Sequence, residues 1–304
     1  MAVVGPVVVG VDAGGTASRA VVTDAAGVVL GRGTAGPGNP SAGGPPAARA
    51  VGSALRSALG SLDPASVAAG VVGVAGVSAL ADPAVAAAFA AEWRSLGLRC
   101  DMAVVGDAVT AFAAGGAWPS GAVLIAGTGA VAALVDGLEI ARVADGLGWL
   151  LGDEGSGLWL GLQATRLAAR RWSAPLARAV AAHAGAATPD DLVHWAGALP
   201  PFGALAPLVC ELADAGDPDA AAIVADAASR LVATLDSLAA PATPVVLAGG
   251  LLVAGTPVRR GVLATLEARG TPVGTAGDPA LGAARLASAR RPVARSRPGG
   301  VPPG

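Results

Sequence analysis

The sequence lacks lysine and tyrosine, so all 20 of its basic residues are arginine. Asn39 and Gln163 are the single asparagine and the single glutamine among 304 residues. The absence of lysine excludes Schiff-base chemistry and the lysine of a Walker-type phosphate loop. Because the composition favours Ala, Gly, Pro, Arg and Val throughout, residues that depart from this bias carry the most information.

Cysteine and charge are also scarce. Cys100 and Cys210 show no CxxC or Cys/His spacing, which excludes a zinc or iron–sulfur site built by one chain. Two cysteines in a chain of this length favour a reducing compartment. Charged residues make up 14% of the chain, the net charge is −2, and no basic stripe crosses its body. These features argue against nucleic acid as a partner.

The mean hydropathy of +0.61 raises the question of a membrane protein. However, glycine pairs, Pro119 and Gly127-Thr-Gly129 interrupt the longest uncharged run, 108–135. A spanning helix needs about 20 steadily apolar residues. Since no basic residue precedes the first apolar run, the N-terminus also differs from a signal peptide. We expect a cytoplasmic protein without a membrane partner.

The first third of the chain alternates apolar runs with glycine turns. This pattern predicts a meander of three strands, followed by alternating helices and strands. The predicted elements are strands at 7–11, 19–23 and 28–30, a helix at 47–59, a strand at 71–77, a helix at 83–96 and a strand at 102–106.

The second part repeats the opening arrangement of strand, glycine turn and strand, which predicts two related domains facing a central cleft. We therefore expect an α/β fold with domains at 1–117 and 118–289. The basic tail 290–304 has the composition of a disordered segment. The predicted elements are strands at 122–126, 131–135 and 139–143, helices at 156–172, 175–184, 204–215 and 219–238, a strand at 244–248 and a helix at 279–290.

Three glycine-rich turns follow apolar strands, at Asp12-Ala-Gly-Gly-Thr16, Gly127-Thr-Gly129 and Gly249-Gly250. Glycine lets backbone N–H groups approach phosphate oxygens, and the threonines add hydroxyl donors. Asp12 lies where a Mg²⁺ on the phosphates needs a carboxylate. Because lysine is absent, Mg²⁺, backbone amides and Arg19 must balance the charge of a triphosphate. The expected ATP-binding residues are Gly14, Gly15, Thr16, Arg19, Gly127, Thr128, Gly129, Gly249 and Gly250.

These turns resemble motifs of the actin-like, sugar-kinase and Hsp70-type ATPase superfamily. Gly10–Thr16 and Ala126–Ala130 are similar to its two phosphate motifs, and Val245–Leu251 is similar to its adenosine motif. The most specific likeness is Gly146–Gly157, which contains Gly-Asp-Glu-Gly-Ser. This segment, which we call the signature segment, resembles the N-acetylglucosamine kinase and BadF/BadG-type branch, with its bacterial glucosamine kinases. The resemblance covers 7–290 and implies two actin-like (ribonuclease H-like) domains, MgATP as donor and a homodimer.

The resemblance also implies roles for single residues. Asp107, after a predicted strand, would be the base that faces the accepting hydroxyl, and Asp12 would bind Mg²⁺. Each of these residue types has a structural alternative: Asp107 suits a helix cap, Asp12 and Asn39 suit turns, and an acidic pair suits a helix N-terminus. The implied sugar-binding residues are Asn39, Thr128, Asp153 and Glu154.

The implied reaction is phosphoryl transfer from MgATP to O6 of an amino sugar. Asp145 lies before the signature, in a stretch that is glycine-rich in N-acetylglucosamine kinases. A carboxylate there would attract the ammonium of glucosamine, whereas an acetamide prefers neutral donors. We therefore expect Asp145 to bind substrate and glucosamine to be favoured. The alternatives are N-acetylglucosamine as the substrate and Asp145 as a turn residue.

Two further classes of function stay open at this point. A BadF-type ATPase that activates a dehydratase bridges an iron–sulfur cluster with paired cysteines, and this chain has no suitable pair. A non-catalytic sugar sensor that binds DNA would need an added helix-turn-helix or basic region. We expect an enzyme rather than either of these.

Overall fold

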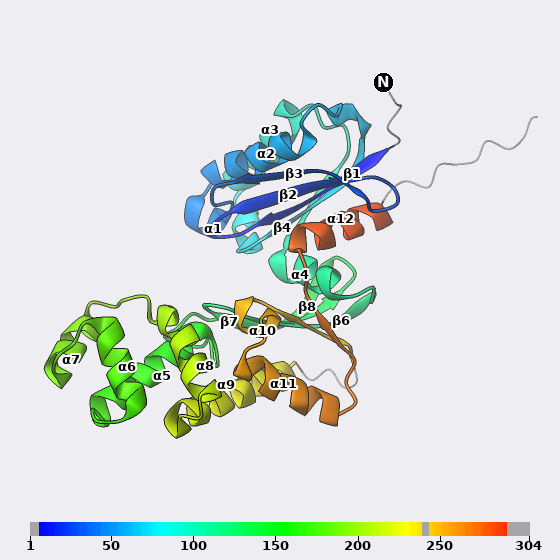
Figure 1. The fold of residues 1–304 in the computed structure, drawn as a ribbon. Coiled ribbons are helices and arrows are strands. Elements are labelled where there is room, and N and C mark those ends of the chain that lie inside the picture. The colour runs from blue at the N-terminus through cyan, green and yellow to red at the C-terminus, as the bar shows by residue number, and fades with distance from the viewer. Residues whose placement is uncertain (1–5, 239–242, 291–304) are drawn as a thin grey trace, which may run out of the picture. The chain divides into compact units, whose positions relative to one another are not determined.

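The computed structural model describes residues 6–238 and 243–290, which form two compact units (Figure 1). Within the described residues, one unit runs to Asp107 and includes the residues from Ala283 onward, and the other is Ala108–Gly282. Each unit is built on one five-stranded sheet. This division differs from the predicted domain boundary at 117, and the predicted tail lies outside the described residues. The fold is α/β, as the sequence predicts.

The sheet of the first unit has the order β3-β2-β1-β4-β5. Its first three strands form the predicted antiparallel meander, and β4 and β5 run parallel to β1. The valine-rich strand β1 is buried almost throughout, as expected for a central strand covered on both faces. The strands are β1 (Val7–Ala13), β2 (Ser18–Thr23), β3 (Val29–Ala35), β4 (Val67–Val74) and β5 (Met102–Gly106).

Helix α2 packs closely on this sheet. A Cβ atom on Gly33 of β3 would lie 2.1 Å from the carbonyl oxygen of Ala54, so glycine allows the close approach. Val51, Leu55 and Phe89 fill the core between the helices and β1. The helices are α1 (Pro40–Gly43), α2 (Pro46–Leu59), α3 (Pro83–Ser95) and α12 (Pro279–Ala289), with 3-10 helices at Pro64–Ser66 and Val77–Ala81.

The sheet of the second unit has the order β10-β9-β6-β7-β8, with β9 parallel to both β6 and β10. Figure 1 shows its additional helices, α5 to α9, in green and yellow. The strands are β6 (Ser120–Ala126), β7 (Ala130–Asp136), β8 (Glu139–Asp145), β9 (Val245–Ala248) and β10 (Val273–Thr275). The helices are α4 (Asp107–Gly115), α5 (Gly157–Arg170), α6 (Pro175–Ala184), α7 (Pro189–Gly197), α8 (Ala206–Asp214), α9 (Pro218–Asp236), α10 (Gly250–Val253) and α11 (Pro257–Ala268), with a 3-10 helix at Phe202–Leu205.

The elements of this unit that were not predicted include two helices, α7 and α11, and strand β10. Local signals mark both helices, because Thr188 and Asp191 form a capping box before α7 and Thr256 caps α11 ahead of a proline. Strand β10 has three residues and exists through its pairing with β9. Short strands of this kind depend on tertiary contacts rather than on local sequence.

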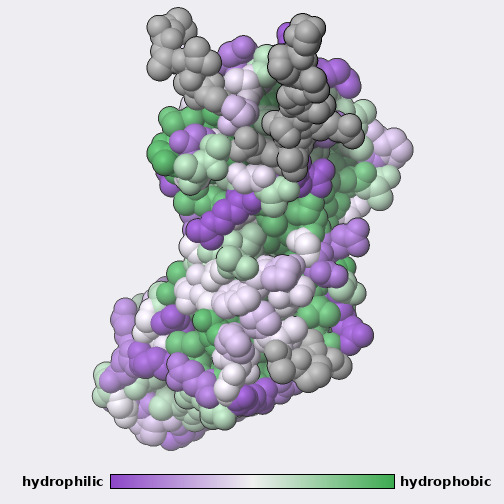
Figure 2. Space-filling model, turned by 90° about the vertical axis from the view of Figure 1, so that its right-hand side faces the viewer, coloured by the Kyte–Doolittle hydropathy of each residue, from purple (hydrophilic) through white to green (hydrophobic). Residues whose placement is uncertain are grey.

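The surface of the described residues carries apolar as well as polar side chains. On the face shown in Figure 2, hydrophobic and hydrophilic residues alternate over short distances. None of the helices in the described part of the chain combines the length and apolar character that a membrane span requires.

Candidate active site

The carboxyl ends of three parallel strands gather the candidate residues of the first unit. Ala13 at the end of β1 pairs with Val74 of β4, which pairs with Gly106 of β5. Residues that follow these strands therefore meet at one edge of the sheet. Asp107 comes directly after β5, is partly buried and begins α4. This position suits both a base and a helix residue, and its catalytic role stays a prediction.

Asp12 and Arg19 lie opposite each other on β1 and β2. Their side chains form an ion pair, with Arg19 Nη1 at 3.7 Å from Asp12 Oδ2, and the Asp12 side chain is only 16% exposed. The phosphate turn closes beside them, because the N–H of Gly14 donates to Ala17 O at 3.0 Å. Mg²⁺ in such sites is held by one or two carboxylates together with phosphates and water. A single carboxylate beside a glycine turn fits that requirement.

Asn39 caps the short helix α1 by accepting a hydrogen bond from Ser41 N at 2.8 Å on its Oδ1. Ser41 Oγ donates to Gly76 O at 3.1 Å, which ties this loop to the end of β4. Gly76 has φ +73°, and a Cβ there would lie 2.9 Å from Asn39 Oδ1. Asn39 therefore has the structural role of a turn and helix-capping residue. This role uses only the Oδ1 atom of Asn39, so the two N–H donors on Nδ2 remain for a sugar hydroxyl.

The two glycine turns of the second unit lie against each other. Gly127–Gly129 follows β6, and Gly249-Gly250 follows the neighbouring parallel strand β9. Gly249 has φ +83°, and a Cβ there would lie 2.3 Å from the carbonyl oxygen of Ala126. Only glycine fits this contact, so the second phosphate turn and the adenosine motif are built as one backbone surface.

The signature segment joins the same surface through the start of α5. The N–H groups of Gly157 and Leu158 donate to Gly127 O at 2.7 Å and to Thr128 O at 3.1 Å. Ser156 caps α5 by accepting from Trp159 N at 3.1 Å. Gly157, the last glycine of the signature, and Leu158 therefore fasten α5 to the Gly127–Gly129 turn, while Ser156 caps the helix.

Asp153 of the signature segment lies over the Gly127–Gly129 turn. Its Oδ1 accepts from Ala130 N at 3.0 Å, and a Cβ on Gly129 would lie 2.9 Å from that oxygen. Burial raises the pKa of the Asp153 carboxyl above its usual value, the hydrogen bond from Ala130 opposes this, and the charge of Asp145 adds to it. Thr128 and Asp153 were expected to hold the sugar together, and the Asp153 carboxylate does lie against the turn that carries Thr128.

The raised pKa of Asp153 predicts a pH-dependent effect of Asp153→Asn. The folded protein disfavours the ionised carboxyl relative to the unfolded chain, so this group's stabilisation is complete at acidic pH and is lost as pH rises through its folded pKa. We expect the melting temperature of the variant, relative to the native protein, to be higher at pH 7 than at pH 3. Asp136→Asn, at an exposed site, is the control. If the variant and the native protein differ in melting temperature by the same amount at pH 7 and at pH 3, the prediction is wrong.

Asp145 has a structural role that was not expected. Its Oδ1 accepts from Asp153 N at 2.7 Å and its Oδ2 from Glu154 N at 2.9 Å, so both oxygens bind backbone of the signature segment. Asp145 itself has φ +63°, a left-handed conformation that Asp tolerates better than most residues. A Cβ on Gly152 would lie 2.0 Å from its Oδ1, which shows how closely the segment closes around it. Asp145 therefore holds the backbone at Asp153 and Glu154 in place, and its binding of an ammonium group stays a prediction.

Glu154 has a protein partner that was not expected, and its contact with the sugar stays a prediction. Its carboxylate forms an ion pair with Arg230 of α9. Arg230 Nε lies 3.1 Å from Asp226 Oδ1, and its guanidinium lies 4.9 Å from the centre of the Trp159 ring. Arg230 was not predicted as part of this site, because Glu154 and Trp159 lie far from it in the chain.

The tip of the signature segment exposes large apolar side chains. Leu147, Leu150 and Leu151 are 65%, 74% and 77% exposed, and Trp149 is 45% exposed. These four side chains therefore lie at the surface of this unit.

Comparisons with known proteins identify relatives that match most of the chain. The model of the BadF/BadG/BcrA/BcrD ATPase family matches residues 9–287. A predicted N-acetylglucosamine kinase of Chromobacterium violaceum is 28% identical, with 93% of this chain and 99% of that chain covered and a TM-score of 0.74. No curated protein matches the sequence.

Two further solved structures share the fold at lower identity. A predicted N-acetylglucosamine kinase of Porphyromonas gingivalis is 23% identical over 93% of this chain and 99% of that chain, with a TM-score of 0.70. A ROK family glucokinase of Streptomyces griseus, solved with glucose and AMPPNP, is 23% identical. The match covers 92% of this chain and 99% of that chain, with a TM-score of 0.57. Both sheets therefore belong to actin-like domains, as expected. Because the family model matches residues 9–287, the chain belongs to the BadF/BadG/BcrA/BcrD ATPase family.

Proposed function

We propose that this protein is an ATP-dependent kinase that phosphorylates O6 of an amino sugar, with N-acetylglucosamine as the first candidate and glucosamine as the second. The family match and the neighbouring structures support the class of ATP-dependent sugar kinase. The observation that carries the proposal is the position of Asp153. Its carboxylate is held on the second phosphate turn by the hydrogen bond from Ala130 N.

Each unit contributes its own groups to this reaction. In the second unit, the Gly127–Gly129 turn and Gly249-Gly250 offer backbone to the nucleotide, while Asp153 and Thr128 hold the sugar ring. The transition state of phosphoryl transfer is loose, so the protein mainly aligns the reactants and stabilises charge. Holding a carboxylate on the phosphate turn contributes directly to that alignment.

In the first unit, Gly14, Gly15 and Thr16 follow β1 and would bind phosphate, with Arg19 beside them. Asp12 would hold Mg²⁺, which supplies neutralisation of phosphate charge. Asn39 would donate its Nδ2 hydrogens to a sugar hydroxyl. In this proposal Asp107 orients the accepting hydroxyl and takes its proton.

The choice of sugar follows from the contacts of Asp145. The argument for glucosamine required a carboxylate available to an ammonium group, and both Asp145 oxygens accept backbone hydrogen bonds. N-acetylglucosamine therefore takes first place, in agreement with the names of the two relatives with the highest TM-scores given above. The homodimer and the cytoplasmic location stay predictions.

The dehydratase-activator alternative finds little support in the cysteines. Cys210 is 8% exposed within the core of the second unit. Burial raises the pKa of its thiol to about 11, so the thiolate that iron requires is disfavoured. Among the described residues, no three His, Cys, Asp or Glu side chains gather as a metal site.

The test is ADP release by the purified protein with MgATP and N-acetylglucosamine, glucosamine, glucose or no sugar. We expect turnover with N-acetylglucosamine to exceed turnover with the other sugars, because both Asp145 oxygens already accept hydrogen bonds from the signature segment. Selective turnover of glucosamine would reverse the order of the two candidates. ADP release that ignores every sugar would reject the kinase and support an ATPase of the activator class.

Asp145→Asn separates positioning from direct recognition. If Asp145 acts through Asp153, the variant should raise KM about tenfold for N-acetylglucosamine and for glucosamine alike, since one charge-assisted hydrogen-bond pair is weakened. A direct ammonium contact predicts instead a selective loss for glucosamine. Asp136→Asn is the matched control at an exposed strand end, and it should leave both KM values unchanged.

A further inference from the structure

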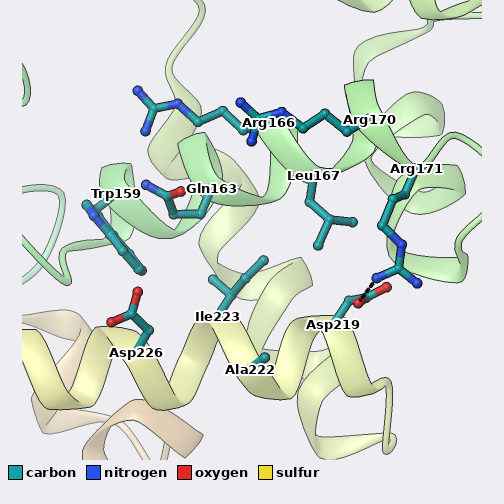
Figure 3. A pocket seen from close by; sticks show the side chains of 10 residues that line it. All are labelled: Trp159, Gln163, Arg166, Leu167, Arg170, Arg171, Asp219, Ala222, Ile223 and Asp226. Carbon is teal, nitrogen blue, oxygen red and sulfur yellow. Dashed lines mark hydrogen bonds and ion pairs between the residues drawn. The ribbon is translucent and has the colours of Figure 1, made fainter.

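A pocket of about 410 Å³ lies between α5 and α9, within the second unit (Figure 3). Residues of one face of α5, at the helical spacing of three or four, face a matching stripe of α9. The lining side chains are Trp159, Gln163, Arg166, Leu167, Arg170 and Arg171 of α5 and the residue after it, and Asp219, Ala222, Ile223 and Asp226 of α9.

Two bridges close the ends of this pocket. At one end Arg171 forms an ion pair with Asp219, drawn as the dashed line in Figure 3. At the other end Arg230 binds Asp226 and lies over the ring of Trp159. Both carboxylates of the pocket are therefore already neutralised by arginine, while the apolar side chains of Leu167 and Ile223 lie between them.

The other polar side chains of the pocket all carry N–H donors, and the amide of Gln163 also carries an acceptor oxygen. Arg166 and Arg170 extend along α5 at the edge of the pocket, and Gln163 points toward Trp159 (Figure 3). Within residues 6–238 and 243–290, none of these three side chains has a hydrogen-bond or ion-pair partner. Guanidinium forks match carboxylate and phosphate oxygens. The volume falls in the range of about 300–1,000 Å³ that is usual for small-molecule sites.

We propose that this pocket binds a small organic anion, with an apolar ring against Leu167, Ile223 and Trp159 and a carboxylate or phosphate at Arg166 and Arg170. A ligand here touches Trp159 and Asp226, which are two of the three partners of Arg230. The third partner is Glu154 of the signature segment. Occupancy of the pocket therefore alters how firmly Arg230 holds that segment. Its consequence for sugar binding rests on the proposed function, whereas ligand binding does not.

Calorimetric titration of the full chain tests the binding step. The probes are 1-naphthyl phosphate, 1-naphthoate and the neutral 1-naphthol, which share one apolar body. We expect at least one of the two anions to bind about tenfold more tightly than 1-naphthol, and the stronger one identifies the preferred head group. Arg166→Gln with Arg170→Gln should remove this advantage and leave 1-naphthol unchanged. Ala222→Phe, at an exposed position, should weaken all three by filling the pocket.

The control is Arg49→Gln with Arg56→Gln, a pair of exposed arginines on α2 that should leave every affinity unchanged. Anions that bind no better than 1-naphthol, or arginine variants that behave like this control, would overturn the site. The site would also be overturned if ATP displaced 1-naphthyl phosphate and if Arg166→Gln with Arg170→Gln had no effect on its binding.

Hydrogen exchange of residues 145–155 tests the coupling without an activity measurement. Saturating 1-naphthoate, or 1-naphthyl phosphate if that is the tighter ligand, should change exchange in this segment in the native protein and leave it unchanged in Arg230→Gln. An unchanged native segment, or an equal change in Arg230→Gln, would overturn the coupling. Because these readouts need no sugar turnover, failure of the kinase assay leaves them interpretable.

Discussion

Replacement of Asp107 by asparagine is expected to lower kcat by about 10²–10⁴-fold with little change in ATP affinity. The carboxylate would take the proton of the accepting hydroxyl, and an amide of the same size cannot. Asparagine is a good residue at a helix start, so α4 should survive the change. Steady-state kinetics with the best sugar, together with nucleotide titration, measure both quantities.

Asp101→Asn is the matched control, because Asp101 is exposed and precedes β5, whereas Asp107 follows it. It should leave kcat unchanged. Nearly full kcat in Asp107→Asn would remove this residue from the reaction and leave it a structural role at the start of α4.

Gly249→Ala is expected to destabilise the protein by about 2–4 kcal/mol and to weaken ATP binding more than tenfold. The new Cβ would lie 2.3 Å from the backbone oxygen of Ala126, in a residue with φ +83°. That oxygen cannot move without shifting the end of β6 and the phosphate turn. Thermal unfolding and nucleotide titration measure the two effects.

Gly216→Ala separates backbone strain from the close contact. Gly216 has φ +89° and open space around its missing Cβ, so alanine there should cost about 1 kcal/mol and leave ATP binding intact. Equal losses in the two variants would mean that strain alone explains Gly249, and that its contact with Ala126 is unimportant.

The sequence by itself determined the elements and the motifs. Apolar runs broken by glycine predicted the central strands, since strand burial and turn conformation depend on local residues. The signature Gly-Asp-Glu-Gly-Ser indicated the family, and the family model confirms it. Helix α7 was equally readable from its capping box and was missed.

The tertiary structure decided which partner each acidic side chain has. Sequence reasoning placed Asp145, Asp153 and Glu154 together at one substrate, but only Asp153 lies on the phosphate turn. The left-handed backbone at Asp145 turns its carboxylate onto the signature segment. Glu154 forms an ion pair with Arg230, which lies 76 residues later in the chain. Hydrogen-bond partners depend on backbone conformation and on contacts distant in the chain, and neither is written in a local motif.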